Sequence, residues 1–161
     1  MHYVCDCTAD FVYKSCEFPV PTGPNFIVDN FLKVFNTFVS AWEPTEDEPD
    51  RLPKNAEDVL NNAIVFSLIW GIGCQIDEAT RPKINEFFTD LIYGEEVCKK
   101  HGLDCSFDEP LKMKHNLGDS HKSLFDICFK EQDLKWISWI NTIPQFETPV
   151  GKPFSEVIVP T

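Results

Sequence analysis

The residues with the clearest potential for chemistry lie in the stretch CKKHGLDC, which places Cys98, His101 and Cys105 close together. Cysteine thiolates and imidazoles are the ligands of structural zinc sites, and His115 or His121 would supply a fourth ligand. The spacing matches neither a zinc finger nor a zinc ribbon, so ordinary packed or exposed thiols are the favoured interpretation. We therefore expect no metal site. These residues remain the candidate ligands if the protein is instead a zinc-binding protein.

The same stretch raises the possibility of a cysteine nucleophile, because Cys98 and His101 can be neighbours on one helical turn. A nucleophile also needs a group that orients its base and donors that bind an oxyanion, and no pattern indicates either. GIGC at Gly71 lacks the Lys-Ser/Thr of a phosphate-binding loop, and helix termination explains Gly71 and Gly73 better. Trp136 and Trp139 are interpreted as packing anchors. The sequence predicts no catalytic residue.

The composition narrows the class of partner. The 161 residues carry a net charge of −12, which argues against a nucleic-acid surface and against an anionic membrane as partners. The seven cysteines are irregularly spaced, and the opening MHYVCDC has neither the basic nor the apolar region of a secretory signal. The longest apolar stretch, AIVFSLIWGIG, is about half a membrane span. We expect reduced thiols in the cytosol.

The elements that would position these residues are mainly helical. Residues 24–42 are predicted to form a helix with an apolar stripe along one face. Further apolar residues widen this stripe, so we expect other elements to pack against more than one side of the helix. A Pro-rich acidic loop follows at 43–54, and then a central buried helix over 56–71 with Asn55 as its N-cap. The apolar stripe of the first helix consists of Ile27, Phe31, Phe35, Phe38 and Trp42, widened by Phe26, Val28, Leu32, Val34 and Val39.

A third helix is predicted after Asp77, its expected cap, with Pro82 near its start and Gly94 at its end. A helical turn over 95–101 follows it. The expected buried face of the third helix consists of Ile84, Phe87, Phe88, Leu91 and Ile92.

From residue 103 the pattern changes to a long loop, followed by a β-hairpin within 124–140. The alternation places Ile127 and its neighbours Phe125 and Phe129 on one side, and Cys128 with Asp126 and Lys130 on the other. Prolines keep the tail from Asn141 extended. The sequence therefore predicts a mainly α fold, with a helical subdomain at 1–102 and a loop, hairpin and extended Pro-rich arm at 103–161.

Several stretches, in this order, resemble dynein heavy chains. FVYKSCEFPVPTGPNFIVDNFLKVFNTFV resembles the helical lid of the second AAA+ module, and FSLIWGIGCQIDEATRPKINEFFTDL resembles an Ile-Trp-x-x-Gly helix followed by Arg-x-Lys-x-x-x-Phe. SLFDICFKEQDLKWISWINTIPQFE resembles the Phe-Asp-Tyr and Trp-x-x-Trp segment, although Cys128 replaces the usual Tyr. PFSEVIVPT resembles the start of the third module, whereas residues 97–123 do not align with the family.

This resemblance implies an AAA+ lid-like helical bundle cut from a dynein motor ring, which passes nucleotide-dependent motion between modules while catalysis occurs elsewhere in the parent ATPase. It implies ATP or ADP at neighbouring sites, with Ile158, Val159, Pro160 and Thr161 beside the adenine of the next module. The implied partners are the rest of the heavy chain, other dynein chains and, through the full motor, microtubules. The implied location is the cytoplasm and cytoskeleton, with the ciliary axoneme favoured. The alternatives are a stand-alone acidic helical interaction module and a small zinc-binding protein.

Overall fold

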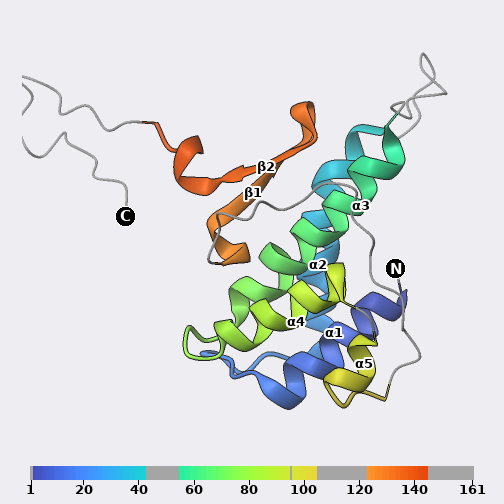
Figure 1. Ribbon diagram of the computed structural model, residues 1–161, viewed down its shortest axis with the longest axis vertical. Helices are drawn as coiled ribbons and strands as arrows, with labels where there is room; N and C mark the ends of the chain where they lie inside the picture. Colours follow the sequence, from blue (N-terminus) through green and yellow to red (C-terminus); the bar gives the residue numbers. More distant parts are fainter. Residues whose placement is uncertain (1, 43–54, 95, 105–122, 145–161) are drawn as a thin grey trace, which may run out of the picture.

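The computed structural model describes residues 2–42, 55–94, 96–104 and 123–144. They form a helical bundle with one antiparallel hairpin, which confirms the mainly α class (Figure 1). The extended arm was predicted from residue 141, but Trp139–Thr142 forms a 3-10 turn, and residues 145–161 lie outside the described part. The elements are α1 (His2–Ser15), α2 (Pro24–Val39), α3 (Ala56–Ser67), α4 (Arg81–Tyr93), α5 (Val97–Lys100), β1 (Ile127–Lys130) and β2 (Lys135–Ser138).

Helix α1 was not predicted. Its buried face, which includes Val4, Cys7, Phe11 and Val12, follows helical spacing, but a cysteine and a threonine interrupt the apolar pattern. Thr8 is nevertheless fully buried, because its hydroxyl donates a hydrogen bond to the Val4 carbonyl at 2.7 Å. The buried face of α1 therefore has the pattern of an amphipathic helix when Cys is counted as an apolar residue.

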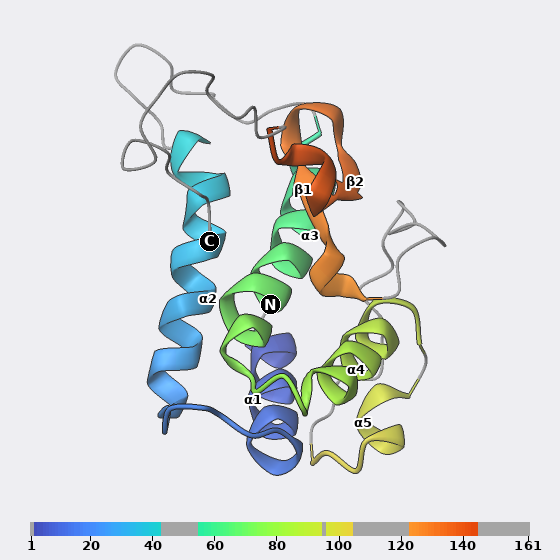
Figure 2. The ribbon, with the colours of Figure 1, turned by 90° about the vertical axis from the view of Figure 1, so that its left-hand side faces the viewer.

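Helix α2 begins with Pro24 at its first turn, where the missing N–H costs nothing. The expectation that it is covered on more than one side is wrong. Ile27 and Phe31 are buried, but Phe26 is 53% exposed and Leu32 is also exposed. The reason is its position at the edge of the bundle, where one face contacts α3 and the turn that follows α3 (Figure 2).

Helix α3 begins after Asn55 as predicted, although the Asn55 side chain makes no capping hydrogen bond. The helical run does not end at Gly71, which corrects the interpretation of both glycines as terminators. It continues through a π-helical turn, Leu68–Ile72, in which the Gly73 N–H donates to the Leu68 carbonyl, and then a 3-10 turn, Gly73–Gln75. The predicted burial of this central segment is confirmed.

The N-cap position of helix α4 is Thr80 and not Asp77, although the Thr80 side chain makes no capping hydrogen bond. The Asp77 carboxylate instead accepts a hydrogen bond from the Ala79 N–H at 2.8 Å, which shapes the turn before the helix. The predicted buried face and the end at Gly94 are both confirmed.

The hairpin pairs Ile127 with Ser138 and Lys130 with Lys135. Its alternation is only partly as predicted, because Cys128 is buried together with Ile127 and Phe129. Strand β1 lies against α3, and burial there overrides the two-residue period. Ile127 and Leu124 belong to the same hydrophobic core as the helices, while the division between 102 and 103 stays a prediction. In the described ranges, no helix combines the length and apolarity needed to span a bilayer.

Candidate functional site

The candidate ligands Cys98 and His101 do lie on one short helical turn at α5, but they face different partners. Cys98 is 2% exposed, and its Sγ lies 3.3 Å from the Sγ of Cys7 on α1. The Nε2 atom of His101 lies 2.7 Å from an Oδ2 of Asp90 on α4. Cys105, like His115 and His121, lies outside the described residues.

His101 completes a stack of rings between α1, α4 and α5. Phe11 and Phe87 are stacked with their centroids 4.1 Å apart and their planes 5° from parallel. The imidazole plane is nearly perpendicular to both rings, with each centroid 5.2 Å away. We call Cys7, Phe11, Phe87, Asp90, Cys98 and His101 the α1–α5 seam.

A charged network surrounds the Asp90 end of this seam. Lys100 Nζ lies 2.6 Å from Asp90 Oδ2 and 3.4 Å from Glu86 Oε1. Burial acts to raise the pKa of the Asp90 carboxyl, but hydrogen bonds from Lys100 and His101 outweigh it and hold that pKa below its usual range. The hydrogen bond to Asp90 in turn raises the pKa of Lys100.

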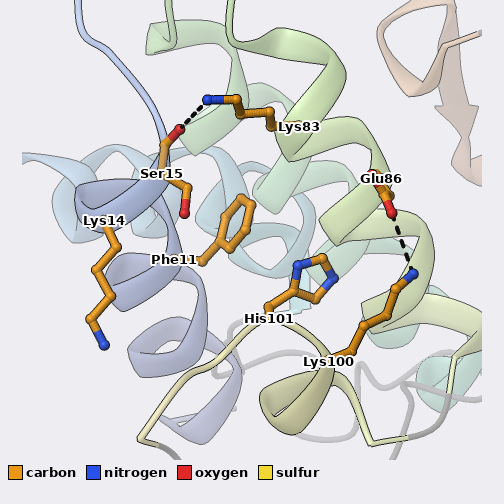
Figure 3. A pocket seen from close by; sticks show the side chains of 7 residues that line it. All are labelled: Phe11, Lys14, Ser15, Lys83, Glu86, Lys100 and His101. Carbon is orange, nitrogen blue, oxygen red and sulfur yellow. Dashed lines mark hydrogen bonds and ion pairs between the residues drawn. The ribbon is translucent and has the colours of Figure 1, made fainter.

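A cavity of about 450 Å³ opens beside the seam, and Figure 3 shows Phe11 and His101 next to each other in its lining. Three lysines and one glutamate contribute to its lining, and Lys83 Nζ donates to the Ser15 carbonyl at 3.4 Å. Cys98 does not line this cavity, and it is buried in the folded bundle. The lining residues are Phe11, Lys14, Ser15, Lys83, Glu86, Lys100 and His101.

The zinc alternative receives no support from the described side chains. Within those ranges no three His, Cys, Asp or Glu residues are grouped so that they could hold a metal ion. Burial raises the pKa of Cys16 to about 11, and it also raises the pKa values of Cys5 and Cys128. These three thiols are therefore poor nucleophiles near neutral pH.

A second constellation joins the helices to the hairpin, and the sequence pattern gave no indication that its members meet. Phe66 and Trp70 lie one turn apart on α3 and its π-helical extension. Trp70 lies 5.2 Å from Trp139 and 6.2 Å from Phe125, measured between ring centroids. Phe66 lies 6.3 Å from Trp136. We call this set of rings the helix–hairpin joint: Phe38, Phe66, Trp70, Phe125, Phe129, Trp136 and Trp139.

Two of the three indole N–H groups in the joint make hydrogen bonds across it. Trp70 Nε1 donates to the Ile127 carbonyl at 3.3 Å. Trp136 Nε1 donates to Asn62 Oδ1 on α3 at 2.7 Å, and Asn62 is only 2% exposed. The packing-anchor interpretation is thus confirmed for Trp136, whereas Trp139 is 44% exposed.

The two glycines of GIGC allow the helical side of the joint to form. A Cβ on Gly73 would lie 2.8 Å from the Phe125 ring, and a Cβ on Gly71 would lie 2.8 Å from the Phe31 Cα on α2. Real Cβ atoms do not approach backbone this closely, so Gly71 permits α2 to cross the π-helical turn at short range. Arg81 adds a cation–π contact, with its guanidinium carbon 5.6 Å from the centre of the Phe125 ring.

The residues proposed for an adenine edge, Ile158, Val159, Pro160 and Thr161, lie outside the described residues. Among the described residues, the rings and indole hydrogen bonds of the helix–hairpin joint connect the helices to the hairpin.

Comparison with known proteins agrees with this architecture. Residues 1–141 match the family model "Dynein heavy chain AAA lid domain". Dynein axonemal heavy chain 3 from Homo sapiens is 26% identical, and the protein of the same name from Mus musculus is 23% identical; each alignment covers 94% of this chain. The chain spans about 4% of the length of each relative. No solved structure matches it.

The family match includes every helix described above and both strands of the hairpin, together with the rings that join them. Sequence resemblance, helical architecture and family model therefore agree that this chain belongs to the dynein heavy chain AAA lid domain family.

Proposed function

We propose that the chain is a non-catalytic part of a dynein-type motor ring, and that it passes nucleotide-dependent motion from one AAA+ module to the next. The helix–hairpin joint is the observation that carries this proposal. Motion of a helical lid reaches a neighbouring module only if the lid and the segment leading onward move together. The joint supplies that connection between α3 and the hairpin.

The joint favours rigid-body movement because packed rings and directed hydrogen bonds restrain different motions. Interlocked aromatic rings resist sliding, since each displacement opens a void against a large side chain. The hydrogen bonds of Trp70 and Trp136 fix the rotation of the hairpin relative to α3. The Leu124 N–H also donates to Asn85 Oδ1 on α4 at 2.7 Å, so the hairpin is attached to two helices. Rotation of this bundle would carry the hairpin with it.

The names of the relatives supply the setting of the proposal. Both are named axonemal dynein heavy chains, which favours the ciliary axoneme and its cytoskeleton as the location. The partners would be the remainder of the heavy chain, other dynein chains and microtubules bound by the full motor.

ATP or ADP would occupy neighbouring sites of the parent ring, with catalytic residues elsewhere in the heavy chain. The stretch Ile158, Val159, Pro160 and Thr161 would form one edge of the adenine pocket in the next module. Only its resemblance to the start of that module supports this assignment.

The test uses the full-length heavy chain with Trp136→Ala. This change removes the ring contacts to Phe66 and Phe129 and leaves the buried Asn62 without its donor. We expect nucleotide binding by the motor to persist, while microtubule gliding velocity and microtubule-stimulated ATPase activity fall severalfold. Hydrogen exchange of the hairpin should increase in the same protein, because its attachment is weakened.

Two variants serve as controls. Trp136→Phe keeps an aromatic ring and should retain more of the velocity than Trp136→Ala. Lys33→Ala removes only an exposed ion pair with Asp29 on α2 and should leave the velocity unchanged. The proposal fails if Trp136→Ala frees the hairpin, as measured by hydrogen exchange, and yet gliding and ATPase activity remain normal.

A further inference from the structure

A pair of buried thiols connects the first described helix to the last helix of the bundle. Cys7 is 0% exposed and Cys98 is 2% exposed, and their sulfur atoms lie 3.3 Å apart although 91 positions separate them in the chain. The contact belongs to no ligand site or catalytic arrangement described above. It brings two oxidisable atoms together from separate elements.

We propose that Cys7 and Cys98 form an oxidation-dependent disulfide that joins α1 to α5. Hydrogen peroxide is the oxidant. One thiolate attacks a peroxide oxygen, which breaks the O–O bond and yields a sulfenic acid and, after protonation, water. The second sulfur then attacks the sulfenyl sulfur, forms the S–S bond and releases the hydroxyl as a second water. Two thiols are oxidised and one peroxide is reduced.

Formation of the disulfide requires little movement of the two cysteines. The sulfur atoms must approach from 3.3 Å to about 2.05 Å, which small side-chain and backbone adjustments can provide. Positioned groups of this kind react far faster than the same groups brought together by diffusion. The pair is therefore a better substrate for disulfide formation than two cysteines without such a contact.

The location of α5 explains how a buried pair is reached by an oxidant. This helix is a single turn between two residues with left-handed backbone, Glu96 with φ of 53° and Gly102 with φ of 63°. A segment of this size opens locally at a lower free-energy cost than unfolding of the whole bundle. A small peroxide can enter such an opening, whereas a bulky thiol such as glutathione is hindered. This selectivity favours the internal disulfide over a mixed disulfide.

The disulfide would hold the whole α1–α5 seam. Phe11 lies one turn beyond Cys7 on α1, and His101 lies one turn beyond Cys98, so the thiol contact and the ring stack are successive layers of the same interface. Oxidation would add a covalent link to these layers and remove the independent opening of α5. The inference does not depend on the motor function proposed above.

The experiment maps disulfides in the native, full-length polypeptide after treatment with hydrogen peroxide. Cleavage on the amino side of aspartate places each of the seven cysteines on a different peptide, because Asp6 separates Cys5 from Cys7 and Asp104 separates Cys98 from Cys105. Free thiols are alkylated before cleavage, and linked peptides are identified by mass spectrometry. We expect the Cys7–Cys98 link to exceed every other link to Cys98 by roughly tenfold or more.

Matched variants identify the reacting sulfur. Cys5→Ser changes a half-buried thiol on the same helix and should leave the Cys7–Cys98 link intact. Cys7→Ser should abolish it and leave Cys98 as a thiol or a sulfenic acid. Protection of α5 from hydrogen exchange should rise on oxidation of the wild-type and Cys5→Ser proteins, but not of Cys7→Ser. The proposal is overturned if peroxide leaves both thiols free in the folded wild-type protein, or if Cys98 pairs mainly with Cys5, Cys16 or Cys105.

Discussion

The α1–α5 seam and the helix–hairpin joint both connect segments far apart in the chain, but they use different chemistry. The seam combines two stacked phenylalanines with a thiol pair and a His101–Asp90 contact. The joint combines aromatic rings with hydrogen bonds from uncharged indoles. The two lie toward opposite ends of the bundle (Figures 1 and 2).

This difference affects how each interface responds to its surroundings. Protons and oxidants change the charge or the bonding of side chains in the seam. The rings and indoles of the joint carry no group that titrates over the ordinary pH range, so protonation leaves them unchanged. One end of the lid therefore contains a carboxyl that responds to pH and a thiol pair that, by our proposal, responds to oxidants, whereas the other end is joined by uncharged rings and indoles.

The largest effect should come from Phe87→Ala, which removes a fully buried ring from the seam. We expect the free energy of unfolding to fall by about 3–5 kcal/mol, because the lost ring leaves a cavity against Phe11. Urea denaturation followed by circular dichroism would measure this loss. Phe87→Leu is the control and should cost less, and a loss below about 1 kcal/mol for Phe87→Ala would show that the ring stack contributes little.

The next effect concerns the helical base of the joint. Gly71→Ala places a Cβ 2.8 Å from the Phe31 Cα, and backbone cannot yield as a flexible side chain would. We expect a loss of about 1–3 kcal/mol in the free energy of unfolding. Gly23→Ala is the matched control, since no atom lies within 4 Å of its added Cβ, and it should be neutral within about 0.5 kcal/mol. Equal stabilities for the two variants would contradict a close crossing at Gly71.

A smaller effect should come from a substitution that removes the indole N–H of Trp136 but keeps an aromatic ring in the joint. Trp136→Phe keeps an aromatic side chain but leaves the buried Asn62 Oδ1 without its donor, which costs about 1–2 kcal/mol. Denaturation at pH 7 and at pH 4 should give the same loss, because neither partner titrates. The partly exposed Trp139, changed to Phe, is the control. A loss that varied with pH would remove the contrast between joint and seam.

The smallest effect should be the most specific to the seam. The pKa of Asp90 is lowered in the folded protein, so its contribution to stability is present above the unfolded-state pKa and disappears as pH falls through the folded value. Asp90→Asn should cost about 1 kcal/mol at pH 7 and progressively less below about pH 4. Stability against pH, measured by urea denaturation of both proteins, would show this convergence. Curves that stay parallel into the acid range would indicate that the Asp90 charge is unimportant.

Several of the elements could be predicted from spacing alone. The buried face of α4 follows a helical period, and the hairpin follows from alternation around a polar turn. Helix α1 was missed because Cys7 and Thr8 occupy positions where the pattern expects aliphatic residues. Cys128 was assigned to the polar side because period-two alternation does not show that β1 has α3 beside it.

The α1–α5 seam and the helix–hairpin joint could not be predicted from the sequence. Local spacing reports which face of an element is apolar, but it does not report which other element covers that face. Cys98 and His101 were paired because they are three residues apart in the sequence, whereas the fold brings Cys7 to Cys98 and Asp90 to His101. Gly71 was interpreted as the end of a helix because that is the usual role of glycine in a local pattern. The sequence around it does not show that the backbone of Phe31 passes close by.

The sequence by itself therefore determined the helical class, the hairpin and the resemblance to a dynein lid, because periodicity and ordered motifs are properties of neighbouring residues. Only the tertiary structure decided that the rings form one joint and that two distant thiols touch. Those contacts depend on how whole helices cross, and the crossing is set by close packing among side chains that come from every part of the chain.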